Sequence, residues 1–113
     1  MQDFMLLFRS NYPESQMPDG EMAALEKKWE HWINDLAARQ RLSHPGHRLL
    51  AKGKTRKPGD VVTDGPYTES KECVCGFIII KAASLEEAFE LTKDCPIQEM
   101  GGNVEVREVM IRG

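Results

Sequence analysis

The sequence predicts an α+β fold in a single domain that covers residues 1–113. Short apolar segments with the period of β-strands lie near both ends of the sequence and after its middle, and two segments with helical periodicity lie between them. A chain of 113 residues is long enough to bury one hydrophobic core. No internal repeat or low-complexity stretch interrupts this pattern. We therefore expect one sheet and two helices around a single core.

Three segments are predicted to be strands of this sheet. Phe4–Arg9 is apolar on both of its alternating faces, so it should lie in the interior of the sheet. Cys75–Ala82 is β-branched and apolar on both faces, which is typical of a central strand. Val104–Ile111 alternates valines with charged residues, as in a strand that turns one face to the core.

The first helix is predicted to begin at Pro18 and to end near Leu42. Proline is favourable at a first helical position, and acidic residues follow it where the helix dipole favours them. Pro45-Gly46 is interpreted as the signal that stops the helix. Apolar residues at spacings of three and four form one stripe, which comprises Met22, Leu25, Trp29, Trp32, Ile33 and Leu36.

The second helix is predicted from a capping box. Ser84 stands at the N-cap position, and Glu87 is placed to reach back to the backbone. Pro96 is expected to end the helix. The stripe expected to face the core comprises Leu85, Ala88, Phe89, Thr92 and Cys95.

Two shorter strands are predicted between the helices, at His47–Lys52 and Gly59–Thr63. A basic segment bounded by glycine and proline, Lys52–Lys57, joins them and is expected to be a solvated hairpin. The turn Asp64-Gly65-Pro66 follows, and its residues favour a rigid, shaped backbone. A charged loop of this kind between core strands is a favourable place for a site.

This order of elements is typical of a ferredoxin-like antiparallel sheet with two helices on one face. The other face would then expose Met5, Leu7 and alternate residues of the isoleucine-rich strand. An apolar patch of this kind usually marks an interface. We therefore expect a homodimer that packs sheet against sheet.

Composition excludes several classes of function. Hydrophobic residues make up 41% and charged residues 29% of the chain, as in an ordinary folded protein. The net charge of −3, with scattered cations, gives no footprint for nucleic acid. Apolar runs are too short to span a membrane. Three cysteines do not form a disulfide framework, so we expect a cytoplasmic protein with reduced thiols.

Several segments together carry a resemblance to a known family. They are Val61–Glu72, Gly76-Phe77, Ala82-Ala83-Ser84, Glu87-Ala88, Cys95-Pro96-Ile97, Gly101-Gly102 and Val104–Arg107, with Phe4–Arg9, Lys28-Trp29, Trp32 and Gly46 in the first half of the chain. The sequence thus resembles the DGPF branch of the YCII-related proteins over nearly its whole length. Tyr67 stands where that family usually has Phe, and Cys75 stands where it often has a second Gly. The resemblance implies a dimeric α+β barrel.

The resemblance also implies candidate catalytic residues. One YCII branch carries a His on the first helix and an Asp on a neighbouring loop as a suspected acid–base pair, and His31 and Asp64 are the nearest candidates here. Two alternatives stay open. Trp29 or Trp32 fills the helical place instead, or Asp64 only braces its turn.

Ligand-binding candidates come from charged residues near the bare face and the turn. Arg107 and Arg9 suit a carboxylate or phosphate ligand, with an ion pair to Glu105 as the alternative for Arg107. Glu69 and Lys71 could orient an acidic or carbonyl substrate, although charges beside a turn are more often solvated.

A zinc site is the remaining interpretation that the sequence offers. His44, His47, Cys73 and Cys75 supply four zinc-type ligands, but structural sites usually have two to four residues between cysteines. We expect neither metal nor cofactor. The function favoured at this point is a polar pocket for a small carboxylate or carbonyl metabolite, with cofactor-free proton transfer as its chemistry. The alternative is a non-enzymatic binding or regulatory module that acts through dimer assembly.

Overall fold

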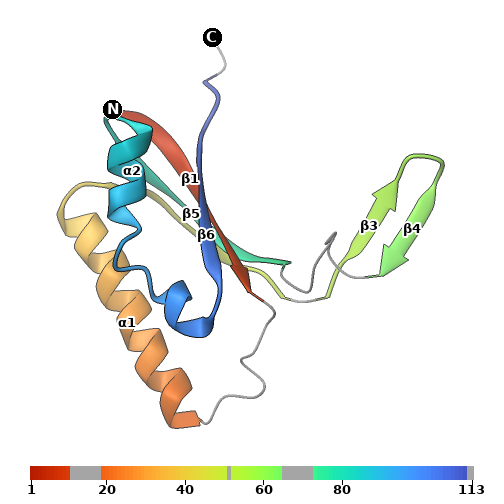
Figure 1. Ribbon diagram of the computed structural model, residues 1–113, viewed down its shortest axis with the longest axis horizontal. Helices are drawn as coiled ribbons and strands as arrows, with labels where there is room; N and C mark the ends of the chain where they lie inside the picture. Colours follow the sequence, from red (N-terminus) through yellow and green to blue (C-terminus); the bar gives the residue numbers. More distant parts are fainter. Residues whose placement is uncertain (11–18, 51, 65–72, 112–113) are drawn as a thin grey trace.

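The computed structural model describes residues 1–10, 19–50, 52–64 and 73–111 (Figure 1). It has an α+β fold, in which the helices lie on one side of a four-stranded antiparallel sheet of order β2-β5-β1-β6. This order fits the ferredoxin-like arrangement. The sheet strands are β1 (Gln2–Ser10), β2 (Leu42–Arg48), β5 (Cys73–Ala82) and β6 (Asn103–Glu108). The helices are α1 (Asp19–Ala38), α2 (Leu85–Leu91) and the short 3₁₀ helix η2 (Pro96–Met100).

The core lies between the sheet and the helices, and β1 lies at its centre. Phe4, Leu6 and Phe8 alternate along β1 on the face that the helices cover, and all three are buried. β5 and β6 flank β1, with Ile80 and Ile78 opposite Phe4 and Leu6. The predictions of an interior first strand and a central isoleucine-rich strand are therefore confirmed.

The bare face of the sheet is the one turned away from the helices. Met5 and Leu7 of β1 point to this face, opposite Ile79 and Phe77 of β5. These four side chains are half-buried, and among the described residues their cover comes from neighbours within the sheet. The order of elements predicted helices on one face of the sheet, and the structure has this arrangement (Figure 1).

The first helix ends earlier than predicted, at Ala38 rather than near Leu42. Gln40 adopts a left-handed conformation with φ of 59°. The Arg41 N–H donates to the Leu36 carbonyl at 2.8 Å, and the Gln40 N–H donates to the Ala37 carbonyl at 3.0 Å. This pair of hydrogen bonds is a Schellman motif, which closes the helix without the usual glycine.

The interpretation of Pro45-Gly46 as a helix stop was wrong, because both residues lie inside β2. The predicted strand His47–Lys52 is correspondingly shifted towards the N-terminus, to Leu42–Arg48. The pairing of β2 with β5 changes register between His44 and His47. Gly46 occupies this bulge with φ of 66°, and a Cβ there would lie 1.6 Å from the Phe77 carbonyl oxygen. The proline and glycine therefore shape an edge strand rather than end a helix.

The basic segment between the predicted short strands is itself a strand. β3 (Lys54–Lys57) pairs with β4 (Val61–Asp64) in a separate two-stranded sheet. We name residues 52–64 the arm. It extends away from the main sheet on the side opposite the helices (Figure 1). A hairpin was predicted here, but its first strand was wrong, because the basic segment forms that strand and His47-Arg48 belong to the main sheet.

The start of α2 agrees with its predicted cap, whereas its predicted inward stripe is partly wrong. The Glu87 N–H donates to the Ser84 hydroxyl at 3.1 Å, and the Glu87 carboxylate accepts from the Ala83 N–H at 3.4 Å. α2 ends at Leu91, and Pro96 begins η2 instead of closing α2. Leu85 and Phe89 are exposed, while the stripe's other members, Ala88, Thr92 and Cys95, are buried.

Candidate functional site

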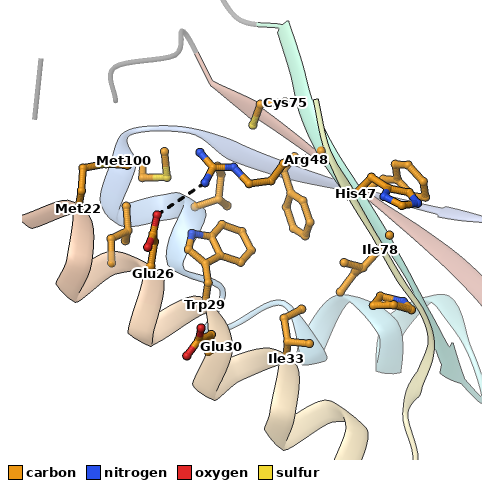
Figure 2. Close-up of a pocket in the computed structure, with 17 residues that line it drawn as sticks. Met22, Glu26, Trp29, Glu30, Ile33, His47, Arg48, Cys75, Ile78 and Met100 are labelled. Atoms are coloured by element: carbon orange, nitrogen blue, oxygen red, sulfur yellow. Dashed lines mark ion pairs between the residues drawn. The ribbon is translucent and has the colours of Figure 1, made fainter. Parts of the chain in front are cut away.

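A cavity of about 350 Å³ lies between α1 and the sheet, near the end of β2 and the start of β5 (Figure 2). Ligand pockets of small proteins begin at about this size. Most of its wall is apolar, and the charged side chains Glu26, Glu30 and Arg48 also line it. The apolar wall includes Phe8, Leu25, Trp29, Ile33, Ile78 and Met100.

The cavity follows from a position of the sheet that has no side chain. Gly76 of β5 lies opposite Phe8 of β1, so it faces α1 but fills no space there. A Cβ at Gly76 would lie 3.0 Å from the His47 carbonyl oxygen, so β2 also approaches closely at this point. Bare backbone therefore forms part of the floor of the cavity beneath the side chains of α1.

Phe8 and Trp29 line the cavity, and the ring of Trp32 packs against both of them from outside it. Phe8 packs edge-to-face against Trp29 and Trp32, with ring centroids 5.0 and 6.1 Å away. The Trp32 indole N–H donates to the Leu91 carbonyl at 3.2 Å and so links α1 to the end of α2. Trp32 is buried in the core, as predicted.

Trp29 differs from Trp32 because its polar atom is not used inside the protein. It is half-buried, and none of the described residues accepts a hydrogen bond from its indole N–H. In Figure 2 the indole nitrogen lies on the side of the ring nearer Glu26. A partly buried tryptophan N–H usually has an acceptor, so this donor is available to a ligand.

The mouth of the cavity carries a loose ion pair. Arg48 of β2 lies 4.0 Å from Glu26 of α1, and both side chains are mostly exposed (Figure 2). An exposed pair at this distance contributes little to stability. The guanidinium of Arg48 is of the type that binds a ligand carboxylate, and it lies beside Glu26 at this mouth.

Comparison with known proteins identifies the family. The family model described as the YCII-related domain matches residues 4–111. The chain belongs to the YCII-related family. A 52-residue stretch, 45% of this YCII-related chain, is 38% identical to an uncharacterised protein of Rhizobium meliloti (strain 1021). The match spans 42% of that relative, which is less than half of its length.

The structure does not bring together the two candidate catalytic residues of this YCII-related protein. His31 is exposed on α1 and lines a shallow depression with Lys27 and Asp35, outside the cavity of Trp29. Asp64 is exposed at the end of β4, opposite Lys54 in the arm. The arm lies on the other side of the sheet from α1 (Figure 1).

The other ligand-binding candidates lie on the bare face or outside the described residues. Arg9 forms an ion pair with Glu105, and the Arg107 Nε lies 4.0 Å from the same carboxylate. An ion pair was the alternative predicted for Arg107. Glu69 and Lys71, with the rest of the loop after Asp64, lie outside the described residues.

The four zinc-type ligands point in different directions. His44 and His47 lie opposite Ile79 and Phe77 on the bare face, with their ring centroids 6.1 Å apart. The Cys73 thiol donates to the Ser10 carbonyl at 3.8 Å, and Cys75 lines the cavity. Within residues 1–10, 19–50, 52–64 and 73–111, no three His, Cys, Asp or Glu side chains are grouped to share a metal ion.

Sequence reasoning did not single out Arg48, Glu26 or Glu30. Glu26 and Glu30 flank the apolar stripe of α1, one turn apart, which is a weak signal on any amphipathic helix. Arg48 could be recognised only after the true position of β2 was known.

In the described part of the chain, no helix combines the length and the apolar character needed to cross a membrane.

Proposed function

We propose that this YCII-related protein binds a small metabolite that has an apolar body and a carboxylate or carbonyl group, in the cavity between α1 and the sheet. The observation that carries this proposal is the pairing of an apolar cavity with two donors, the indole N–H of Trp29 and the guanidinium of Arg48. The apolar body would contact Phe8 and Trp29, and the acidic group would contact Arg48.

The proposal includes a cytoplasmic homodimer of the dimeric α+β barrel type, in the DGPF branch of the family. The apolar bare face supports the dimer, because Met5, Leu7, Phe77 and Ile79 lack a covering layer among the described residues. Free cysteines, two of them buried, support a reducing compartment.

A series of aromatic and aliphatic carboxylates, each matched with its neutral amide, tests the binding proposal. Carboxylates should raise the melting temperature, since a ligand at 100 times its Kd stabilises the folded state by about 2.7 kcal/mol. Arg48→Ala should remove the preference for the carboxylate over the amide. Trp29→Phe, which keeps an aromatic ring but loses the indole N–H, should weaken the binding of both the carboxylate and the amide.

Arg39→Ala is the matched control, because Arg39 is an exposed arginine beside Asp35 and does not line the cavity. It should leave ligand binding unchanged. The proposal fails if no carboxylate changes the melting temperature, or if Arg48→Ala and Arg39→Ala behave alike.

Proton transfer is a second candidate function, and the carboxylates of Glu26 and Glu30 at the cavity favour it. It needs no cofactor. Deuterium exchange at the carbon next to the carbonyl of a bound 2-oxo acid, followed by NMR, would reveal it. Loss of exchange in Glu26→Gln or Glu30→Gln, with binding retained, supports catalysis. Binding without exchange supports the alternative, a non-enzymatic binding module.

A further inference from the structure

Among the described residues, the two strands of the arm form a sheet of their own, separate from the main sheet. A two-stranded hairpin by itself is marginally stable in water. The arm extends on the side of the bare face, which is the side on which a second copy would lie (Figure 1). A surface on another molecule would therefore stabilise it.

One face of the arm combines two cations with an apolar side chain and one carboxylate, and Arg56 also lies 3.6 Å from Asp60. The register places Arg56 opposite Val62 and Lys54 opposite Asp64, so these four residues point to the same face. Val62 is 46% exposed. Residues 52–64 carry a net charge of +2, so the rest of the chain carries −5. The arm thus fits an acidic surface that also has an apolar patch.

α2 presents a surface with these properties. Leu85 and Phe89 lie one turn apart on its outer face and are 50% and 62% exposed. Glu86 and Glu90 follow them directly in the sequence and are also exposed. Among the described residues, no cation forms an ion pair with either carboxylate. The predicted inward position of Leu85 and Phe89 was wrong, and within the described parts of the chain their apolar surface stays exposed.

The two surfaces cannot meet within one chain, because the main sheet separates α2 from the arm (Figure 1). We propose that the arm of one copy docks on α2 of a second copy, with Lys54, Arg56 and Val62 against Glu86, Phe89 and Glu90. Positive charge then meets negative charge, and Val62 covers part of Phe89. In a sheet-to-sheet dimer, α2 of the second copy lies on the far face of that copy's own sheet, so the arm reaches it past the edge of that sheet and adds a second surface to the dimer.

Two complementary variants test the contact. The arm variant carries Lys54→Glu and Arg56→Glu, and the α2 variant carries Glu86→Lys and Glu90→Lys. A dimer of two identical variant chains has like charges in both of its arm contacts. A dimer of one arm-variant chain and one α2-variant chain has opposite charges in both contacts. After subunit exchange of equal amounts, native mass spectrometry should find about nine-tenths of dimers mixed, against one half for random exchange. A salt concentration near 1 M should abolish the preference, since the Debye length is then about 3 Å.

Mixing the arm variant with a chain that carries Lys27→Glu and Arg39→Glu on α1 is the control, and it should give no preference. Circular dichroism melting of each variant checks that it is folded. A random distribution of folded arm and α2 variants overturns the proposal, even if the dimer itself persists through the bare face. Wild-type protein that is monomeric at every concentration overturns it as well.

Discussion

Gly46 shows how a single residue determines the shape of the edge strand beside the cavity. Its φ of 66° is costly for any residue with a Cβ, and the Phe77 carbonyl oxygen occupies the place of that Cβ. Pro45 precedes it, so the pair looks like a break in the sequence although it is a bulge. The same residue types signal a helix stop or a strand bulge, and only the neighbouring strand distinguishes them.

Gly46→Ala should therefore destabilise the protein by about 3 kcal/mol, because it combines backbone strain with a steric clash. Gly59→Ala is the matched control, since Gly59 has φ of 86° but a Cβ added there would meet nothing within 4 Å. It should cost about 1 kcal/mol from backbone strain alone. Urea denaturation measures both values, and equal losses would contradict the steric explanation.

Cys95 makes the stability of the protein sensitive to alkaline pH. Burial raises the pKa of its thiol from 9.0 to about 12, and the neighbouring Cys75 adds to this rise while a backbone hydrogen bond at Ile97 opposes it. Between these two pH values the unfolded thiol loses its proton and the folded thiol keeps it. The contribution is therefore fully present below about pH 9 and is lost as the pH rises towards 12.

The free energy of unfolding should fall above pH 9 more steeply for the wild type than for Cys95→Ala. The difference in slope should approach about 1.4 kcal/mol per pH unit, which corresponds to one proton. Urea denaturation at a series of alkaline pH values measures it. Cys75→Ala should keep most of the wild-type slope, and parallel curves for wild type and Cys95→Ala would exclude this origin.

At the scale of elements, the sequence predicts the type of each core element better than its ends. The apolar stripe of α1, the capping box of α2 and the isoleucine-rich strand β5 are strong local signals, and all three elements form as expected. The end of α1 was missed because Gln40 occupies a left-handed position where glycine is usual. Nothing local marks such a residue in advance.

The helix α2 was predicted, but which of its residues face outward was not. With seven residues it has room for one buried position, Ala88, and the next turn brings Thr92 and Cys95 into the core instead of Phe89. Periodicity alone does not reveal how short a helix is, so the predicted stripe included residues that are in fact exposed. This error concerns the surface that we propose as the docking site of the arm.

At the scale of the whole molecule, the sequence indicates that a pocket exists but not where it lies. The cavity needs Gly76 of β5, Trp29 of α1 and Arg48 of β2 to meet, and these residues are far apart in the sequence. The site predicted at the charged turn after Asp64 rests on residues that are adjacent in the sequence, and this turn lies outside the described residues. Adjacency in sequence cannot reveal a site that several elements build.

The bare face gives the prediction for the whole molecule. Light scattering at micromolar concentration should give twice the chain mass, and Leu7→Asp should reduce it to the mass of one chain. A charge in the middle of an apolar interface costs several kcal/mol when it is buried without a partner. Leu7 is the position chosen for this charge because it lies in the middle of the bare face, between Phe77 and Glu105.

Met110→Asp is the control, because Met110 is almost fully exposed and lies beyond the sheet. It should keep the dimer mass. Circular dichroism must show that Leu7→Asp still folds. A wild-type monomer, or a Leu7→Asp protein that remains dimeric, would remove the sheet-to-sheet dimer from the proposal.

The central place of β1 in the sheet also determines when the protein can fold. Phe4 lies opposite Ile80 on one side and Glu108 on the other, so β1 forms its hydrogen bonds with strands that are synthesised much later than itself. Contacts so distant in sequence slow folding, because a long loop must close before they form. Until β5 and β6 are synthesised, the apolar strand β1 lacks these pairing partners, and unpaired apolar strands are prone to aggregation. Completion of β6, rather than formation of either helix, should release the chain from that state.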